Sequence, residues 1–331
     1  MRKAIPISLA AAMLLTAAAP APSYRLGDPI AVSDGGWDYA RVDADAHKLY
    51  IARTASVTAV DLTTGVATSM ETIQRGHAVV PLSGGRLLVT SGNDATVRFV
   101  DAKDGHELAS IPVGKKPDAA ILDAAGTYAY VMNAADGTVS VIDVAAMKVT
   151  ATITLKPGLE YAAIAGGKLY VNNEEANEIE VADLGKGAAL APIALTGCEE
   201  PSGLAYDAKT NLLVSACANG KAAIVDVASR KLIGLVDIGL GPDAVILDAQ
   251  RRLAFIPCGR DGVLEILSLD APGGVAKVGR VQTEVGARTG ALDPATGVIY
   301  LPTAKFGPPP AAGGRPAMTP GTAHVVVVRP S

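Results

Sequence analysis

The sequence predicts an all-β protein: a seven-bladed β-propeller of four-stranded antiparallel blades. Three observations support this fold class. A unit of roughly 40 residues repeats along the chain. Each unit holds short strand-like runs separated by turn residues, and the last unit is one strand short. Since a single sheet of this kind cannot bury both faces alone, its copies must stack on one another.

The clearest copy of the unit is the stretch 118–158, DAAILDAAGTYAYVMNAADGTVSVIDVAAMKVTATITLKPG. Its apolar runs contain many β-branched and aromatic residues and are bounded by Gly, Asn and Asp, which indicates strands joined by tight turns. The four predicted strands are Asp118–Leu122, Tyr128–Asn133, Val139–Asp143 and Val149–Leu155. Together they form an antiparallel meander.

Aspartates at the end of the third strand give the period of the repeat. They are Asp61, Asp101, Asp143, Asp183 and Asp226, which by subtraction are 40, 42, 40 and 43 residues apart. A sixth copy, Leu264–Ser268, keeps the apolar pattern without the aspartate. Leucine-rich and helical repeats have other periods, so the spacing favours a propeller.

The repeat also predicts how the ring closes. The blades should begin near Gly36, His77, Asp118, Leu159, Pro201, Asp243 and Thr289. The seventh copy has only three strands before the chain ends at Val325–Val328, and Leu26–Val32 resembles the fourth-strand run Ala109–Gly114. We therefore expect the N-terminal strand to join the last blade as its outer strand, which would remove an exposed sheet edge.

The N-terminus has the pattern of a secretory signal peptide. Met1-Arg2-Lys3 is basic, Ala4–Ala19 is apolar, and small residues follow. The run is too short and too rich in alanine to predict a membrane span. We expect a signal peptide over 1–23, cleaved between Ala18 and Ser23, and one mature domain over 24–331. The mature chain would then be periplasmic or extracellular.

Composition limits the possible partners. Aromatic residues make up 4% of the chain and the formal net charge is −4. Proteins that bind nucleic acid need a basic surface, and those that bind single strands also need stacking rings. The sequence therefore indicates a small-molecule or protein partner rather than nucleic acid. We expect a monomer.

Two sets of motifs resemble a known family. Tyr130–Asn133 (YVMN), followed by Thr138–Asp143 (TVSVID), resembles the YVTN-type β-propeller repeat. Weaker versions stand at Tyr170–Asn173 and Leu88–Asn93, and the stretches Cys198–Asp226 and Gly286–Pro302 resemble an exported bacterial subfamily. The resemblance spans roughly the whole mature chain and implies the propeller fold. It implies no single activity, because related propellers include nucleic-acid binders and oxidoreductase subunits.

Candidate binding residues lie in the loops of one predicted face, where first strands begin and second strands end. They are Tyr161, Asn172, Glu174, Glu175, Glu199, Glu200, Arg260 and Arg288. With Glu160, the carboxylates and amides could hold a Ca²⁺-like cation, or a cationic ligand with Tyr161 as an aromatic wall. The arginines could hold an anion. A solvated rim of loops is the alternative.

No catalytic residue is predicted. The four histidines are scattered without metal-ligand spacing, and the motifs C-x-x-C-H and G-x-S-x-G are absent. We expect a non-enzymatic binding or interaction scaffold without a cofactor. The alternative is a metal-assisted propeller enzyme, lactonase-like or quinoprotein-like, that uses the Glu/Asn cluster at the channel mouth.

The three cysteines predict one disulfide. Cys198 precedes the first strand of the fifth blade and Cys217 ends its second strand, so folding the hairpin brings the two together. Cys258 occupies the matching position in the next blade, where strand ends diverge around the ring. We expect Cys198–Cys217 and a buried Cys258 thiol, with three free thiols or Cys217–Cys258 as the alternatives.

Overall fold

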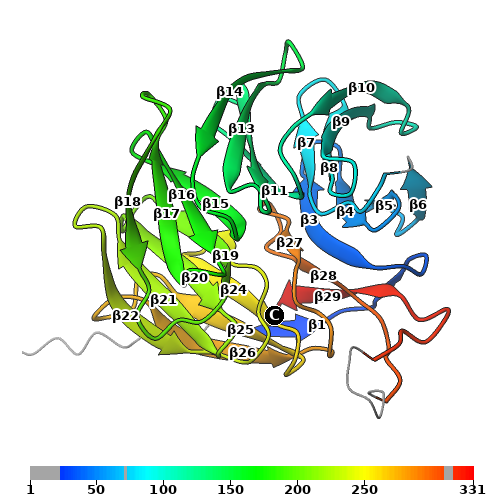
Figure 1. Ribbon diagram of the computed structural model, residues 1–331. Coiled ribbons are helices and arrows are strands. Elements are labelled where there is room, and N and C mark those ends of the chain that lie inside the picture. The colour runs from blue at the N-terminus through cyan, green and yellow to red at the C-terminus, as the bar shows by residue number, and fades with distance from the viewer. Residues whose placement is uncertain (1–22, 71–72, 309–315) are drawn as a thin grey trace, which may run out of the picture.

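The computed structural model describes residues 23–70, 73–308 and 316–331 (Figure 1). These residues form seven antiparallel sheets arranged as the blades of a propeller. The predicted fold class is confirmed. All but the last residue of the predicted signal peptide lies outside the described residues. Within the described part, no helix is long and apolar enough to cross a membrane.

The first three blades use strands β3 to β14. Blade 1 contains β3 (Trp37–Asp43), β4 (Lys48–Arg53), β5 (Val57–Asp61) and β6 (Ala67–Met70). Blade 2 contains β7 (Val79–Leu82), β8 (Arg86–Ser91), β9 (Thr96–Asp101) and β10 (Glu107–Pro112). Blade 3 contains β11 (Pro117–Leu122), β12 (Tyr128–Asn133), β13 (Thr138–Asp143) and β14 (Lys148–Thr154).

The next three blades repeat this order. Blade 4 contains β15 (Leu159–Ala165), β16 (Lys168–Asn173), β17 (Glu178–Asp183) and β18 (Ala188–Ala194). Blade 5 contains β19 (Pro201–Asp207), β20 (Leu212–Cys217), β21 (Lys221–Asp226) and β22 (Lys231–Asp237). Blade 6 contains β23 (Ile246–Asp248), β24 (Leu253–Cys258), β25 (Val263–Ser268) and β26 (Ala276–Gln282).

Blade 7 closes the ring with both ends of the chain. It contains β27 (Ala291–Leu292), β28 (Ile299–Thr303) and β29 (His324–Pro330). The N-terminal strands β1 (Tyr24–Leu26) and β2 (Ile30–Ala31) both pair with β29. In Figure 1, blue β1 lies beside red β29. The prediction that the N-terminal strand joins the last blade is confirmed.

The core lies between the blades and consists mainly of small aliphatic side chains. Every residue of β20 and of β24 is buried, whereas most of outer strand β14 is exposed. Residues from neighbouring blades, such as Val131 and Leu169, belong to the same apolar cluster. Close packing between blades therefore supplies the burial that an isolated blade lacks.

A β-bulge occurs near the start of the first strand in four blades. The pairing register shifts between Trp37 and Ala40 in blade 1 and between Leu159 and Ala162 in blade 4, and blades 3 and 5 show the same shift. A bulge interrupts the alternation of side chains between the two faces of a sheet and changes the direction of the side chains within it. Here it sets the direction of the residues nearest the mouth of the central channel.

We predict that deleting residues 24–35 lowers the melting temperature and the solubility. The deletion leaves the outer edge of β29 unpaired. It also removes Tyr24, whose ring centroid lies 5.0 Å from that of Phe255 in blade 6. The point variant Tyr24→Ala should cause part of this loss and Arg25→Ala, at an exposed position, almost none. Differential scanning calorimetry measures all three. An unchanged melting temperature in the deletion would contradict the role of the N-terminal strand.

Candidate functional site

One polar side chain from each blade occupies the same position at the start of the first strand. In blade 3, for example, Pro117 pairs with the last residue of the second strand, and the next residue is Asp118. The same position in all blades is filled by Asp38, His77, Asp118, Glu160, Ser202, Asp243 and Arg288. We call these seven residues the mouth ring. Four of them are carboxylic acids.

The contacts of the mouth ring show that its members converge. His77 Nδ1 lies 2.8 Å from Asp38 Oδ2 and 3.6 Å from Asp118 Oδ1, which links blades 1, 2 and 3. On the other side of the ring, Arg288 Nε donates a hydrogen bond to Asp243 Oδ2 at 2.7 Å. These pairs partly neutralise a strongly acidic set of groups.

The pKa shifts show that negative charge in the ring is crowded. Burial raises the pKa of Asp118 to about 6, although His77 opposes the shift. Burial, then the charges of Asp118 and Asp243, raises the pKa of Glu160 well above its ordinary value. Burial also raises the pKa of Asp243 despite its bond to Arg288. A buried carboxylate without enough counter-charge resists ionisation in this way, so an added cation would be stabilised here.

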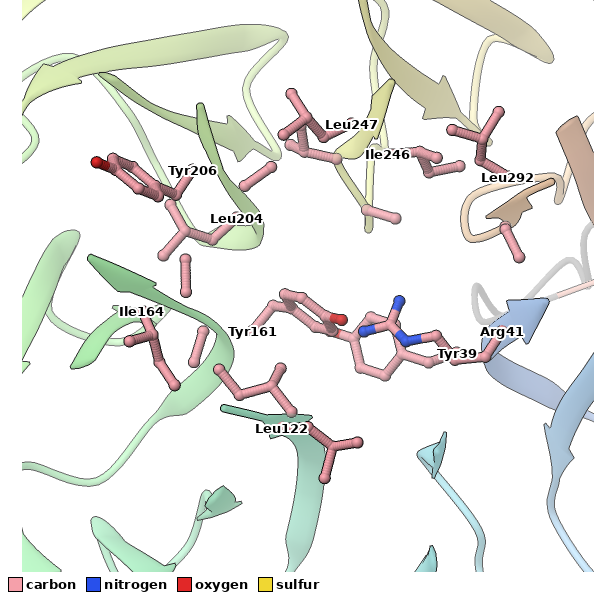
Figure 2. Close-up of a pocket in the computed structure, with 18 of the residues that line it drawn as sticks. Tyr39, Arg41, Leu122, Tyr161, Ile164, Leu204, Tyr206, Ile246, Leu247 and Leu292 are labelled. Atoms are coloured by element: carbon pink, nitrogen blue, oxygen red, sulfur yellow. The ribbon is translucent and has the colours of Figure 1, made fainter. Parts of the chain in front are cut away.

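Two tyrosines lie across the channel beneath the mouth ring. Tyr39 of blade 1 and Tyr161 of blade 4 have ring centroids 4.9 Å apart (Figure 2). The Tyr39 hydroxyl also donates a 3.5 Å hydrogen bond to Glu160 Oε2. Burial, then the nearby carboxylates, raises the pKa of Tyr39 well above its ordinary value, so it remains a protonated donor. We call this pair the tyrosine layer. It separates the acidic mouth from an apolar chamber on the other side.

Four predicted residues line a shallow pocket between blades 4 and 5. Glu174, Glu175, Glu199 and Glu200, together with Asn177, enclose about 520 Å³. The charge of Glu174 adds to the rise in the pKa values of Glu160 and Asp243, so this acidic rim lies close to the mouth ring. The structure therefore brings together the acidic residues of the sequence prediction and joins them to a larger acidic surface.

The other predicted residues have different surroundings. Asn172 is fully buried, and its amide donates to Ser202 O and Gly203 O at 3.0 and 2.9 Å, joining blades 4 and 5. Its side-chain oxygen accepts a hydrogen bond from Ser215. These bonds leave no free group for a ligand. Tyr161 lies in the channel, Arg288 belongs to the mouth ring, and Arg260 is exposed beyond the end of β24.

The predicted disulfide joins Cys198 to Cys217, with Cα atoms 5.3 Å apart. Cys258 is a buried free thiol, as expected. The bond fixes the loop that carries Glu199 and Glu200 to the end of β20. Two hydrogen bonds hold the same loop, from Glu199 N to Asn219 Oδ1 and from Glu200 N to Asn177 Oδ1. The acidic rim is thus tied to the scaffold.

Among the described residues, one buried group could bring metal ligands together. Ligand atoms of Asp38, His77 and Asp118 lie within 4.8 Å of one another. However, Arg75 Nε donates a hydrogen bond to His77 Nε2 at 3.2 Å, so the ring proton sits on Nδ1 and is donated to Asp38. A metal ion at Nδ1 would have to displace that proton. An exposed second group consists of Asp101, Asp104 and His106.

Sequence reasoning named Glu160 and Arg288 as candidate binding residues on this face but did not recognise the ring. Asp118 and Asp243 served only as blade boundaries, and Ser202 received no role. The sequence does contain a pattern that reveals the ring, because aligning the seven first strands places all seven residues at the same position of the repeat. A repeat position that is polar in every blade, beside positions that are apolar, indicates side chains that share one surface around the propeller axis.

Comparison with known proteins supports the fold and no more. No family model matches the chain, and neither does any curated protein. Among solved structures, Kuenenia stuttgartiensis hydrazine synthase is similar, with a TM-score of 0.70 and 18% identity, over 82% of this chain and 94% of that chain. A chain from the crystal structure of a mitotic checkpoint complex has a TM-score of 0.71 and 14% identity, with coverage of 99% and 98%. The protein is a seven-bladed β-propeller, a class of fold often used as a binding scaffold.

We predict that Cys198→Ala/Cys217→Ala lowers the free energy of unfolding by about 3 kcal/mol, as the chain-entropy model gives for a loop of this length. Cys258→Ala is the control, because it removes a buried sulfur without opening a loop. Urea denaturation in an oxidising buffer measures both. Equal losses in the two variants would refute a stabilising disulfide, and peptide mapping without reductant would identify any other pairing.

We predict that Asp118→Asn stabilises the protein at pH 7 but not at about pH 3. The folded-state pKa of about 6 exceeds the ordinary value of 3.8. Well below pH 3.8, therefore, Asp118 is protonated in both states. Between about pH 4 and pH 6 the carboxyl group ionises in the unfolded chain but not in the folded one, so the free energy of unfolding of the wild type falls by up to about 3 kcal/mol. The Asp118→Asn variant has no ionisable group at this position, so its free energy of unfolding does not fall for this reason. Urea denaturation across this range measures the difference, and Asp45→Asn, at an exposed position, should show none. Parallel curves for Asp118→Asn and wild type would contradict the shift.

Proposed function

We propose that the protein is an exported, non-enzymatic binding protein that captures a cationic ligand at the mouth ring. The observation that carries this proposal is the convergence of four carboxylic acids from four blades, against a single arginine in the ring. Buried carboxylates need a counter-charge or a proton. A ligand with positive charge would supply that counter-charge and restore ionisation.

The surroundings favour an organic cation. Beneath the mouth ring, the tyrosine layer offers aromatic rings, which attract ammonium and guanidinium groups. Ammonium groups also donate hydrogen bonds to carboxylates, and such charge-assisted bonds are strong. Because the acidic rim continues the surface toward Glu199 and Glu200, the site suits a ligand with several positive charges. Polyamines and basic peptide segments have this chemistry.

Export and family membership belong to the same proposal. The basic start and apolar run of the N-terminus support secretion to the periplasm or beyond. The Cys198–Cys217 bond is in keeping with an oxidising compartment, where disulfides persist. The motifs around Tyr130–Asn133 support membership of the YVTN-type propellers, and the stretches Cys198–Asp226 and Gly286–Pro302 support its exported bacterial subfamily.

A divalent cation is the second candidate, favoured by the placement of Asp38, His77 and Asp118. Such an ion would act as a Lewis acid and make the protein a metal-assisted enzyme. The proton that His77 shares with Asp38 argues against this candidate. Elemental analysis after exhaustive dialysis decides: a stoichiometric ion supports the metal, and its absence supports the organic cation.

We predict that spermidine binds the wild-type protein and that Asp118→Asn/Glu160→Gln weakens binding by about tenfold or more, because two charge-assisted contacts are lost. Isothermal titration calorimetry at low salt measures this. The matched control is Asp28→Asn/Asp45→Asn, which removes two charges at exposed positions. Trp37, the only tryptophan, precedes Asp38 and provides a fluorescence signal from the mouth.

Two results would overturn the proposal. The first is an absence of spermidine binding to the wild-type protein at low salt. The second is an equal loss of affinity in the ring variant and the control, which would mean that spermidine responds to net charge rather than to the mouth ring.

A further inference from the structure

The chamber on the far side of the tyrosine layer is a second concave site. It has a volume of about 620 Å³ and is lined by residues from six of the seven first-strand regions. Its wall is mainly aliphatic, with Leu122, Ile164, Leu204, Ile246 and Leu292 among the lining residues (Figure 2). The volume and the apolar lining are those of sites for small organic ligands.

The chamber reaches the face opposite the mouth ring. Ala124 and Pro294, which lie in the turns after the first strands of blades 3 and 7, are part of its lining. Tyr39 and Tyr161 also line the chamber, and Figure 2 shows their side chains next to each other. A ligand would therefore enter from this opposite face without passing the acidic mouth.

Arg41 is the one charged residue in the lining of the chamber. Its guanidinium lies over the Tyr161 ring, 5.3 Å from the centroid. Within the described part of the chain, the Arg41 side chain forms neither an ion pair nor a hydrogen bond, and no carboxylate lines the chamber. In Figure 2 the side chain lies among the lining residues, beside Tyr39 and Tyr161.

The side chain of Arg41 is partly buried at the wall of the chamber, where few polar groups surround its charge. Desolvation disfavours its charged form and lowers the pKa of Arg41. The more deeply buried guanidinium of Arg53 donates three hydrogen bonds, to Ser33 O, Gly35 O and Gly36 O, although its Nη1 has no partner among the described residues. Buried charges are normally paired. Arg41 instead presents its donors to an apolar space.

We propose that the chamber binds a hydrophobic monocarboxylate, with the carboxylate on Arg41 and the aliphatic body against the chamber wall. A guanidinium matches a carboxylate with two parallel hydrogen bonds. Tyr161 offers a second donor, because its hydroxyl has no hydrogen-bond partner among the described residues and its ring already lies beneath Arg41. The chamber binds an anion and the mouth ring a cation, so the two proposals can fail separately, although both sites border the tyrosine layer.

Isothermal titration of the mature protein with decanoate and with decanol tests the proposal. Decanoate should bind at least about tenfold more tightly than decanol, because only the acid forms charged hydrogen bonds with Arg41. Arg41→Gln should abolish this preference while leaving decanol binding unchanged. The matched control, Arg25→Gln, removes an exposed positive charge outside the chamber and should behave like the wild type.

Three outcomes would overturn the proposal: no binding of decanoate to the wild type, equal affinity for decanoate and decanol, or undiminished decanoate binding by Arg41→Gln. If Arg41→Gln does not fold, Tyr161→Phe provides the second variant. It keeps the ring and removes the hydroxyl, so decanoate affinity should fall while decanol affinity stays the same. Unchanged decanoate binding in Tyr161→Phe would then overturn the proposed position of the carboxylate.

Discussion

The structure depends on one antiparallel pairing, in which β1 and β2 lie against β29 and close the ring. Closure holds blade 7 between blades 6 and 1, so that Thr289 donates a hydrogen bond to Asp38 O although 251 positions separate them. Once the ring is closed, all seven first strands face one axis. Side chains at equivalent positions must then meet, and the chemistry of the channel follows from that geometry.

The channel is electrostatically divided along its axis. Carboxylates gather at the mouth, where Lys116 and Arg288 offset part of their charge and His77 donates a hydrogen bond to Asp38. The tyrosine layer follows, and beyond it an apolar chamber contains Arg41. Electrostatic forces are strong where water is scarce. This separation therefore gives the two ends of one channel opposite electrostatic character, although every blade has the same fold.

Local patterns predicted much of the fold, because strand period and turn residues act over a few residues. The repeat spacing then showed that the same unit recurs around a ring. The disulfide followed from the geometry of one hairpin. Side-chain direction was harder to predict. Asn172 and Glu174 are two positions apart, yet Asn172 is inside β16 and bonded between blades, whereas Glu174 follows the strand and lines the rim. The mouth ring was missed because its members are distant in sequence and some lie in bulges, where strand alternation fails. Arg41 gave no signal, because only the packed chamber shows that it has no partner.

The residues at the starts of the first strands can be substituted with little effect on the rest of the fold. Each blade contributes a single residue to the mouth ring, while its stability comes from apolar residues in its other strands. One substitution per blade can therefore alter the chemistry of the mouth without repacking the core. Propellers that share the architecture at 14 or 18% identity can thus differ in what they recognise. Substitutions at these seven positions can therefore change the polarity and charge of the mouth while the strands and the core stay the same.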